Sequence, residues 1–349
     1  MKNFFDLQFS ELEALLESYS QPRFRAEQIW QAVYCNFVSS WHEITNLPLN
    51  LRDNLQANYS LSSFSLREKI NAFDGDSTKF LFELPDENAL EAVILRSDGR
   101  ITLCISTQSG CPVGCVFCAT GKYGFHRNLT SGEIVEQVVA LARLLKEAGE
   151  SVSNIVIMGM GEPMLNYDAT LAAIRRFNDP RGLNIGARRI TISTIGIPEK
   201  IRQFAAENLQ VNLAISLHAP TDLLRRELVP IAQKYSIGEI LSACRDYVDS
   251  THRRVTFEYV LINGVNDLPQ HARDLSALLK GLLCHVNLIG LNPTNHYSGR
   301  APQKQAVRDF GKVLLDHHIP TSIRNRQGSD IQAACGQLAG KLTGRSKSS

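Results

Sequence analysis

The sequence lacks a long apolar run, and its first residues lack the small-residue cleavage site of a secretory signal. Residues 1–19 instead carry acidic side chains at helical spacing. A transmembrane helix needs about 20 consecutive apolar residues, so these absences argue against membrane spanning and against secretion. We therefore expect a cytoplasmic protein with no membrane partner.

The chain also lacks a strong excess of charge, with a formal net charge of +2 over 349 residues. So small an excess does not by itself indicate a nucleic-acid partner, although basic side chains gathered on one face can bind RNA without changing the total. Each local basic group, taken alone, is most often a solvated surface charge. These groups are Lys122 with His126 and Arg127, Arg188-Arg189, Arg225-Arg226, His252-Arg253-Arg254, Arg324 with Arg326, and Lys341, Arg345 and Lys347.

Eight cysteines are present, and in a cytoplasmic protein they indicate metal or redox chemistry rather than a disulfide framework. Cys111, Cys115 and Cys118 are spaced CxxxCxxC, so one short loop can turn all three sulfurs toward a common centre. No fourth Cys or His follows closely, although structural zinc and iron–sulfur clusters normally take four protein ligands. The spacing therefore favours an iron with an open coordination position over structural zinc or three buried, reduced thiols.

The hydrophobic period changes along the chain. Residues 1–60 have helix-forming composition with apolar residues at three- and four-residue spacing, which predicts a helical accessory domain. Its role is open between docking of a large substrate and covering one end of the core. Short alternating runs separated by turn residues predict an antiparallel β extension over residues 61–96. This extension leads into the cysteine loop and is expected to bring Glu91 and Cys104 near it.

After the cysteine loop, strand-like and helix-length stretches alternate about six times. This alternation predicts an α/β core over residues 97–330, with a parallel sheet that is either barrel-like or doubly wound. Residues 331–349 form a C-terminal segment, of which 341–349 are expected to be a disordered tail. The predicted strands are 154–158, 189–193, 211–215, 255–261, 286–291 and 321–324, and the helix-length stretches include 131–148, 237–250, 270–280 and 303–317.

Small and polar residues follow these strands, at the carboxyl ends where parallel α/β folds build their active sites. The glycine-rich residues 159–163 let backbone approach a ligand closely, and the carboxylate of Glu162 can receive an ammonium group. A single residue of this kind more often caps a helix or satisfies backbone groups. Their recurrence after successive strands, at Ser193, at 216–218 and at Asn292, favours one polar rim that binds a cofactor.

The CxxxCxxC spacing, with Phe117 before the last cysteine, resembles the cluster loop of the radical SAM (S-adenosylmethionine) superfamily. The resemblance implies an incomplete (β/α)6 TIM-like barrel and one 4Fe-4S cluster bound by Cys111, Cys115 and Cys118. It also implies that S-adenosylmethionine chelates the fourth iron and is cleaved to a 5′-deoxyadenosyl radical by one electron, from a donor such as flavodoxin or ferredoxin. The cofactor contacts that it implies are Gly161, Glu162, Ser193, Ser216, Leu217, His218 and Asn292.

Cys104 and Cys335 lie outside the CxxxCxxC spacing. Two thiols that meet at an active site can alternate between free, alkylated and disulfide states, whereas either alone is a candidate for a buried structural role. The motif DIQAACGQL around Cys335, together with CPVGCVFCATGKYGFHRNL and GMGEP, resembles the RNA adenine methyltransferases of the RlmN/Cfr type. This resemblance runs from the N-terminal module to near residue 340.

In that family the cysteine matching Cys335 is methylated by one S-adenosylmethionine, and a second yields the radical that removes hydrogen from the new S-methyl group. The carbon radical adds to an adenine ring carbon, and the cysteine matching Cys104 attacks the Cys335 sulfur to release the product as a disulfide forms. Such chemistry suits adenine carbon 2, which is not nucleophilic. The resemblance also implies that Glu91 is the general base; the alternative is a solvent-facing strand glutamate.

The resemblance thus implies a monomeric enzyme that methylates adenine carbon 2 in 23S rRNA, and in the anticodon loop of some tRNAs, with two S-adenosylmethionine molecules per turnover. A Cfr-like enzyme acting at carbon 8 is the nearest alternative. Gly290 and Leu291 depart from the usual form of either subfamily, so the position of methylation is open. A non-catalytic RNA-binding protein with a structural cluster is a third possibility, which Cys104 and Cys335 argue against because neither is needed to hold a cluster.

Overall fold

The computed structural model describes residues 1–324, 328 and 330–340. The predicted tail at 341–349 and the basic residue Arg326 therefore lie outside the described residues. Within those ranges, no helix combines the length and the apolar composition that crossing a membrane requires.

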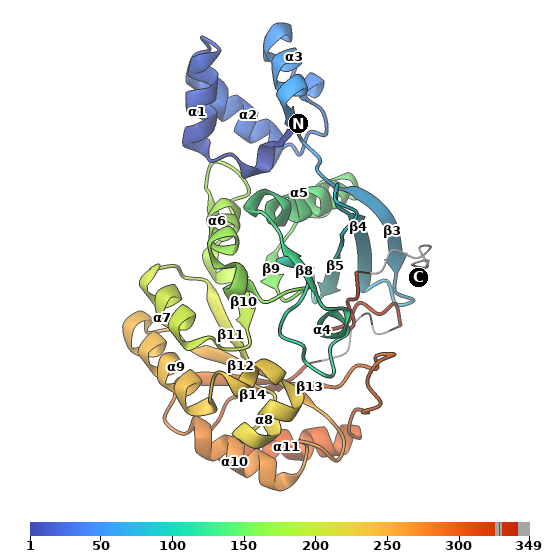
Figure 1. The fold of residues 1–349 in the computed structure, drawn as a ribbon, viewed down its shortest axis with the longest axis vertical. Coiled ribbons are helices and arrows are strands. Elements are labelled where there is room, and N and C mark those ends of the chain that lie inside the picture. The colour runs from blue at the N-terminus through green and yellow to red at the C-terminus, as the bar shows by residue number, and fades with distance from the viewer. Residues whose placement is uncertain (325–327, 329, 341–349) are drawn as a thin grey trace.

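The chain begins with a small helical region, which stands apart from the sheet at the top of Figure 1. Its helices are α1 (Phe9–Ser18), α2 (Phe24–Tyr34) and α3 (Leu49–Asn58). Arg176 of the core anchors α2, because its Nη1 donates to the Tyr34 hydroxyl at 2.6 Å and its guanidinium lies 4.4 Å from the centre of the Trp30 ring. The same guanidinium donates to the Leu7 carbonyl, so a buried cation joins the helical region to the core.

One ten-stranded sheet organises the rest of the chain, in the order β14-β13-β12-β11-β10-β9-β6-β5-β4-β3. Neighbouring strands run parallel from β14 to β6 and antiparallel from β6 to β3. The parallel strands are β6 (Arg100–Cys104), β9 (Asn154–Ile157), β10 (Ile190–Thr194), β11 (Asn212–Ser216), β12 (Val255–Leu261), β13 (Cys284–Gly290) and β14 (Thr321–Ile323). The antiparallel strands are β3 (Ser65–Asn71), β4 (Ser77–Glu83) and β5 (Ala89–Ser97).

Crossover helices connect the parallel strands and cover the outside of the sheet (Figure 1). They are α5 (Ser131–Glu147), α6 (Tyr167–Asn178), α7 (Pro198–Ala206), α9 (Ile237–Thr251), α10 (Pro269–Leu279) and α11 (Lys304–Asp316). In the described residues β14 and β3 end the sheet without pairing to each other, which leaves the barrel incomplete. The α/β fold class predicted from the alternation is confirmed.

The strand β6 takes a position that the alternation alone did not reveal. On one edge β6 continues the antiparallel extension, because Leu103 pairs antiparallel with Ile94 of β5. On its other edge Leu103 pairs parallel with Ile155 of β9. β6 is therefore the first parallel strand, and it joins the β extension and the barrel into one sheet.

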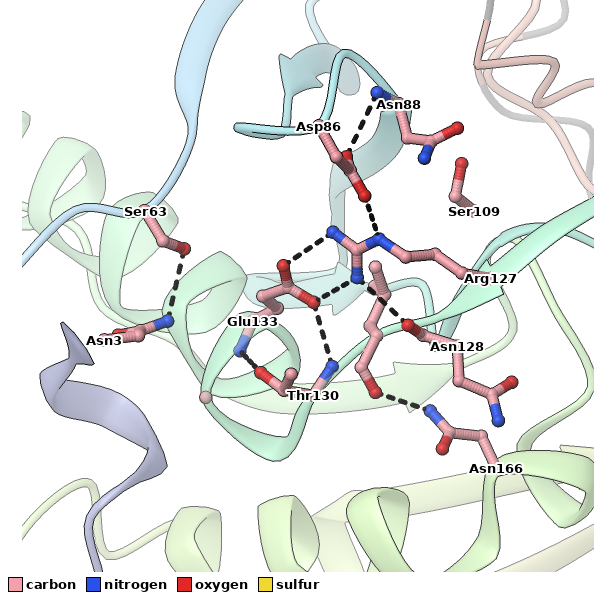
Figure 2. A network of polar contacts seen from close by, with 12 residues as sticks. Asn3, Ser63, Asp86, Asn88, Ser109, Arg127, Asn128, Thr130, Glu133 and Asn166 are labelled. Atoms are coloured by element: carbon pink, nitrogen blue, oxygen red, sulfur yellow. Dashed lines mark hydrogen bonds and ion pairs between the residues drawn. The ribbon is translucent and has the colours of Figure 1, made fainter. Parts of the chain in front are cut away.

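Two further sheets have two strands each: β1 (Lys2–Asn3) pairs parallel with β2 (Tyr59–Ser60) in the helical region, and β7 (Gln108–Gly110) pairs antiparallel with β8 (Phe125–Asn128) and frames the cysteine loop. Arg127 of β8 ties this sheet to the core, because its Nη1 and Nη2 lie 2.7 and 2.8 Å from the two oxygens of Glu133 and its Nε contacts Asp86 (Figure 2). Glu133 also completes the cap of α5 with Thr130. The Arg127 charge is thus paired with two carboxylates of the fold, whereas the side chain of Lys122 is exposed.

Candidate active site

The cysteine loop lies between β7 and the short helix α4 (Ala119–Tyr123) and is fixed by backbone hydrogen bonds. The Cys111 N–H donates to the Gly124 carbonyl at 2.8 Å, and the Cys118 N–H donates to the Cys115 carbonyl at 3.1 Å. Gly110 has a φ of +74°, and a Cβ there would lie 1.8 Å from the Gly124 oxygen. Only glycine fits at this position, so Gly110 determines how the backbone enters the cysteine loop.

A cavity opens at the carboxyl ends of the parallel strands, and the three loop cysteines form part of its wall. Most of the predicted site residues line the same cavity: Cys104, Cys111, Cys115, Cys118, Gly161, Glu162, Ser193, Ser216, His218, Asn292 and Cys335. Two predicted residues, Leu217 and Glu91, are not part of its wall. The cavity therefore brings together residues that are up to 231 positions apart in the chain, as Cys104 and Cys335 are.

The donor set of the loop suits an iron–sulfur cluster. Burial raises the pKa of Cys111 to about 12 and raises the pKa of Cys115 as well, and a coordinating metal reverses such a shift because it binds the thiolate. Within the described residues no three Cys, His, Asp or Glu side chains are placed to hold one metal ion. A cluster does not require that convergence, because each cysteine binds a different iron.

A buried cation lies behind the cysteine loop. Arg225 is fully buried, and its side chain donates to the carbonyls of Leu217 at 3.2 Å and Ile195 at 2.5 Å. The charge of Arg225 lowers the pKa of Cys115, in opposition to the larger effect of burial. Arg225 therefore favours the thiolate form that a cluster ligand must take.

Glu162 joins two of the strand-end loops on the cavity wall. Its carboxylate accepts the backbone N–H of Met164 at 2.9 Å and that of Ile195 at 2.8 Å, and burial raises its pKa to about 7. The preceding Gly161 has a φ of +105°, and a Cβ there would lie 2.7 Å from the Gln108 side chain. Only glycine therefore lets the backbone pack against Gln108 at this point of the cavity wall.

The next strand ends supply hydroxyl and imidazole groups. Ser193 and Ser216 place their hydroxyl oxygens 3.3 Å apart, and both line the cavity. His218 is buried with its pKa lowered to about 3, chiefly by burial, so its ring is neutral; its Nδ1 accepts the Val260 N–H at 3.2 Å. Leu217 lies between Ser216 and His218, but its side chain faces away from the cavity and is fully buried in the hydrophobic core.

The turn that carries Cys335 is bound to the rim and to the cysteine loop. The Asn292 side chain donates to the Cys335 carbonyl at 3.1 Å, and the Ala119 N–H donates to the Gly336 carbonyl at 2.7 Å. Asn292 Oδ1 is buried and has no hydrogen-bond partner among the described residues. A buried acceptor of this kind is expected to have a donor, which a bound cofactor can supply.

Cys104 and Cys335 are both free thiols that line the cavity. Cys104 is at the end of β6, and its pKa is raised to about 12, first by burial and then by the charge of Cys335. The charge of Arg324 opposes this shift in both cysteines. The two thiols therefore lie close enough to interact electrostatically, with one cation acting on both.

Glu91 lies beside the Cys335 turn rather than on the cavity wall. Its Oε2 accepts the Ala339 N–H at 2.7 Å, and its Oε1 lies 3.3 Å from the Lys79 ammonium. Lys79 also donates to the Gln332 carbonyl at 3.5 Å. Because Glu91 is only 4% exposed, the alternative of a solvent-facing strand glutamate is wrong.

Two charged residues of the cavity were missed by the sequence analysis. Glu258 was passed over inside the apolar strand VTFEYVL, and Arg324 was noted only as one of several basic residues. A charge within a strand that is covered on both faces is rarely buried without a reason. The single glutamate inside this apolar run could therefore have pointed to Glu258 from the sequence alone.

The comparisons with known proteins first define a class. The family model of the Radical SAM superfamily matches residues 105–275, which include the cysteine loop and strands β9 to β12. Together with the incomplete barrel and the cavity at its strand ends, this match identifies a radical SAM enzyme. Membership of this class implies an iron–sulfur cluster and S-adenosylmethionine.

The particular family follows from nearly full-length relatives. The ribosomal RNA large subunit methyltransferase N-terminal domain matches residues 2–61. A protein of Thermotoga neapolitana described as a probable dual-specificity RNA methyltransferase RlmN is 50% identical over 339 residues, covering 97% of each chain. One of Geobacillus kaustophilus with the same description is 46% identical, covering 98% of this chain and 93% of the relative.

A solved structure agrees with these relatives. The crystal structure of a radical SAM methyltransferase from Sphaerobacter thermophilus is 47% identical, with a TM-score of 0.96, and covers 98% of this chain and 100% of that chain. The chain belongs to the RlmN family of radical SAM RNA methyltransferases. The family inferred from the three sequence motifs is confirmed.

Proposed function

We propose that the protein methylates carbon 2 of adenine in 23S rRNA and in tRNA, with Cys335 as the methyl carrier. The observation that carries the proposal is the presence of two further free thiols, Cys104 and Cys335, in the cavity that the loop cysteines line. The dual-specificity description of the full-length relatives supports the two classes of RNA. The enzyme acts as a monomer in the cytoplasm.

The cofactor end of the cavity is formed by residues with donors, acceptors and open backbone. Cys111, Cys115 and Cys118 would hold one 4Fe-4S cluster, which would supply one electron for the cleavage of bound S-adenosylmethionine and would be reduced by a flavodoxin or ferredoxin. Glu162 and Asn292 receive the charged end of the cofactor, since both have buried oxygens at the cavity. Ser193, Ser216 and the backbone at Gly161, Leu217 and His218 complete the contacts.

The thiols carry the methyl group through a ping-pong sequence that consumes two S-adenosylmethionine molecules. Cys335 sulfur accepts a methyl group from the first, with loss of the thiol proton. The methyl carbon would then give a hydrogen atom to the 5′-deoxyadenosyl radical and bond to adenine carbon 2. The adduct would return one electron to the cluster and lose its carbon 2 proton to Glu91, and Cys104 would then attack the Cys335 sulfur. The sulfur–carbon bond breaks as the disulfide forms, and its electron pair stays with the carbon, which takes up a proton.

Glu91 is the proposed base for the proton on the adenine carbon. Both of its oxygens are bound in this arrangement, one by Lys79 and one by the Ala339 N–H. Glu91 is also buried and lies off the cavity wall, so the turn that contains Ala339 has to move before Glu91 can reach the RNA base. The proposal accordingly includes a shift of the backbone that follows Cys335 when RNA binds.

Methylation at carbon 8 is the second candidate, because Leu291, which departs from the usual form of either subfamily, lines the cavity. Nucleoside mass spectrometry of RNA treated with the reconstituted enzyme distinguishes the two. The proposal expects 2-methyladenosine from rRNA and from tRNA. A product methylated at carbon 8 would overturn the assignment of carbon 2 and leave the methyl-carrier role of Cys335 standing.

A further inference from the structure

The carboxylate of Glu258 has an unfilled hydrogen-bonding position inside the cavity. The side chain comes from β12, is 5% exposed and lines the cavity wall. Its Oε1 accepts from the Asn287 side chain at 2.9 Å, whereas Oε2 is buried without a hydrogen-bond partner among the described residues. A buried carboxylate oxygen left without a donor is costly, so this position calls for a donor from a ligand.

Arg324 supplies the opposite charge in the same cavity. Its backbone N–H donates to the Leu288 carbonyl at 2.9 Å, which holds it beside β13 just after β14 ends. Its guanidinium contacts Met158 Sδ at 4.0 Å, a weak acceptor that leaves strong donors for a ligand. The side chains of Arg324, Glu258, Cys104 and Cys335 all line this cavity, and the charge of Arg324 acts on the other three.

We infer that Glu258 and Arg324 recognise the target adenine of the RNA. Glu258 Oε2 accepts a hydrogen bond from the 6-amino group, and Arg324 donates to the neighbouring ring nitrogen. An acceptor beside a donor is complementary to adenine, which presents its amino group next to a ring-nitrogen acceptor. A purine with a carbonyl at position 6 would place an acceptor against the carboxylate. This inference rests on the proposed function.

The adenine of S-adenosylmethionine has the same amino group, and the position of Arg324 separates the two sources. Its guanidinium contacts Met158 Sδ, and Met158 directly follows β9, in which Val156 pairs with Cys104 of β6. The guanidinium therefore lies on the side of the cavity that carries Cys104, the thiol proposed to release the product, which assigns the pair to the RNA base.

The test combines Glu258→Gln with changes in the RNA base. Gln keeps the size of the side chain and can keep the bond from Asn287, but it turns an NH₂ donor toward the cavity. Three RNAs carry adenosine, purine riboside or inosine at the target position, and all three retain hydrogen at carbon 2. The wild-type enzyme should methylate purine riboside and inosine at least about tenfold more slowly than adenosine, because each analogue leaves Oε2 without its donor.

In Glu258→Gln, methylation of adenosine should fall by about tenfold or more, and the preference for adenosine over inosine should shrink or invert. Arg324→Met should slow adenosine and purine riboside alike, since both keep the ring nitrogen that Arg324 contacts. Fluorescence anisotropy of the same RNAs gives a binding readout that does not depend on turnover. Glu147→Gln is the matched control, because Glu147 is exposed on the last turn of α5, which leads to the amino end of β9.

The source of the adenine is tested on the cofactor side. Methylation of Cys335 without RNA, read by mass spectrometry of the protein, and S-adenosylmethionine affinity should both stay within about twofold of wild type in Glu258→Gln, because the inference assigns the pair to the RNA base. If Cys335 methylation and S-adenosylmethionine affinity fell as far as RNA methylation does, Glu258 would belong to the cofactor site and the inference would be overturned. An unchanged adenosine preference in a variant that still methylates RNA would also overturn it. A wild-type enzyme that methylated no RNA adenine would overturn the proposed function itself.

Discussion

Lys79 and Glu91 form a buried ion pair under the turn that carries Cys335, with 3.3 Å between Nζ and Oε1. The lysine also binds the carbonyl of Gln332 and the glutamate binds the N–H of Ala339, so the pair holds the backbone on both sides of the methyl-carrier cysteine. The side chains are 10% and 6% exposed, which removes most of the screening that weakens a surface pair. The ion pair therefore positions Cys335 against the barrel.

Replacing Lys79 by Met should leave the Glu91 carboxylate buried and unpaired, at a cost of about 3–5 kcal/mol in the free energy of unfolding. Urea unfolding under anaerobic conditions measures this cost. The double variant Lys79→Met, Glu91→Gln should recover most of it, because both charges are then absent. Additive effects of the two substitutions would show that the pair does not act as a unit.

Cys335→Ala should abolish RNA methylation while leaving iron content and S-adenosylmethionine binding intact, because Cys335 is not part of the CxxxCxxC loop. Iron analysis, the visible absorbance of the cluster and nucleoside mass spectrometry measure the three properties on one preparation. Cys244→Ala is the matched control, since Cys244 is a buried core cysteine of α9 outside the cavity wall. Normal turnover by Cys335→Ala would refute the methyl-carrier role.

Cys104→Ala should stall the enzyme on its RNA, joined through Cys335, because the thiol that releases the product is missing. A denaturing gel with labelled RNA detects the adduct, which should survive boiling in detergent. The adduct should be absent from the double variant that also lacks Cys335. If Cys104→Ala turned over freely with no trapped species, another group would have to resolve the adduct.

Glu136 predicts a pH dependence of stability. It binds Ser63 and Asn3 where the helical region meets α5, and burial raises its pKa from 4.5 to about 7. The folded state therefore holds this proton more tightly than the unfolded state, so the contribution of Glu136 to stability is full below the unfolded pKa and is lost as pH rises toward 7. The loss should be on the order of 2–3 kcal/mol.

Urea unfolding of wild type and Glu136→Gln at several pH values isolates this effect from that of other titrating groups. Between pH 4.5 and 7, the free energy of unfolding of the wild type should fall relative to that of Glu136→Gln. Glu147→Gln, at an exposed site of the same helix, provides the control. A constant difference across this range would contradict the raised pKa of Glu136.

Local patterns in the sequence predicted much of the fold and of the site. The apolar runs marked β9 to β14 to within a few residues, because a buried parallel strand leaves a continuous apolar signal. The spacing of Cys111, Cys115 and Cys118 indicated one loop facing one centre, and all three line the cavity. These features are encoded over a few residues and can be detected without knowing the fold.

Pairings between distant residues could not be predicted in this way. Glu91 and Ala339 are 248 positions apart, and no local pattern tells which backbone group will reach a strand carboxylate. The parallel pairing of β6 with β9 is likewise a property of the assembled sheet. Leu217 was included with its polar neighbours, although its apolar side chain is buried in the core. Proximity in sequence was a poor guide there to which side chains face the cavity.

The central claim is that the methyl group passes through Cys335 and loses a hydrogen before it reaches adenine. Anaerobic turnover of the reconstituted protein with methyl-deuterated S-adenosylmethionine and unmethylated rRNA, followed by nucleoside mass spectrometry, tests it most directly. The account predicts methyladenosine that keeps two of the three deuterium atoms in the transferred methyl group. A product that kept all three would mean direct polar transfer and would contradict the account.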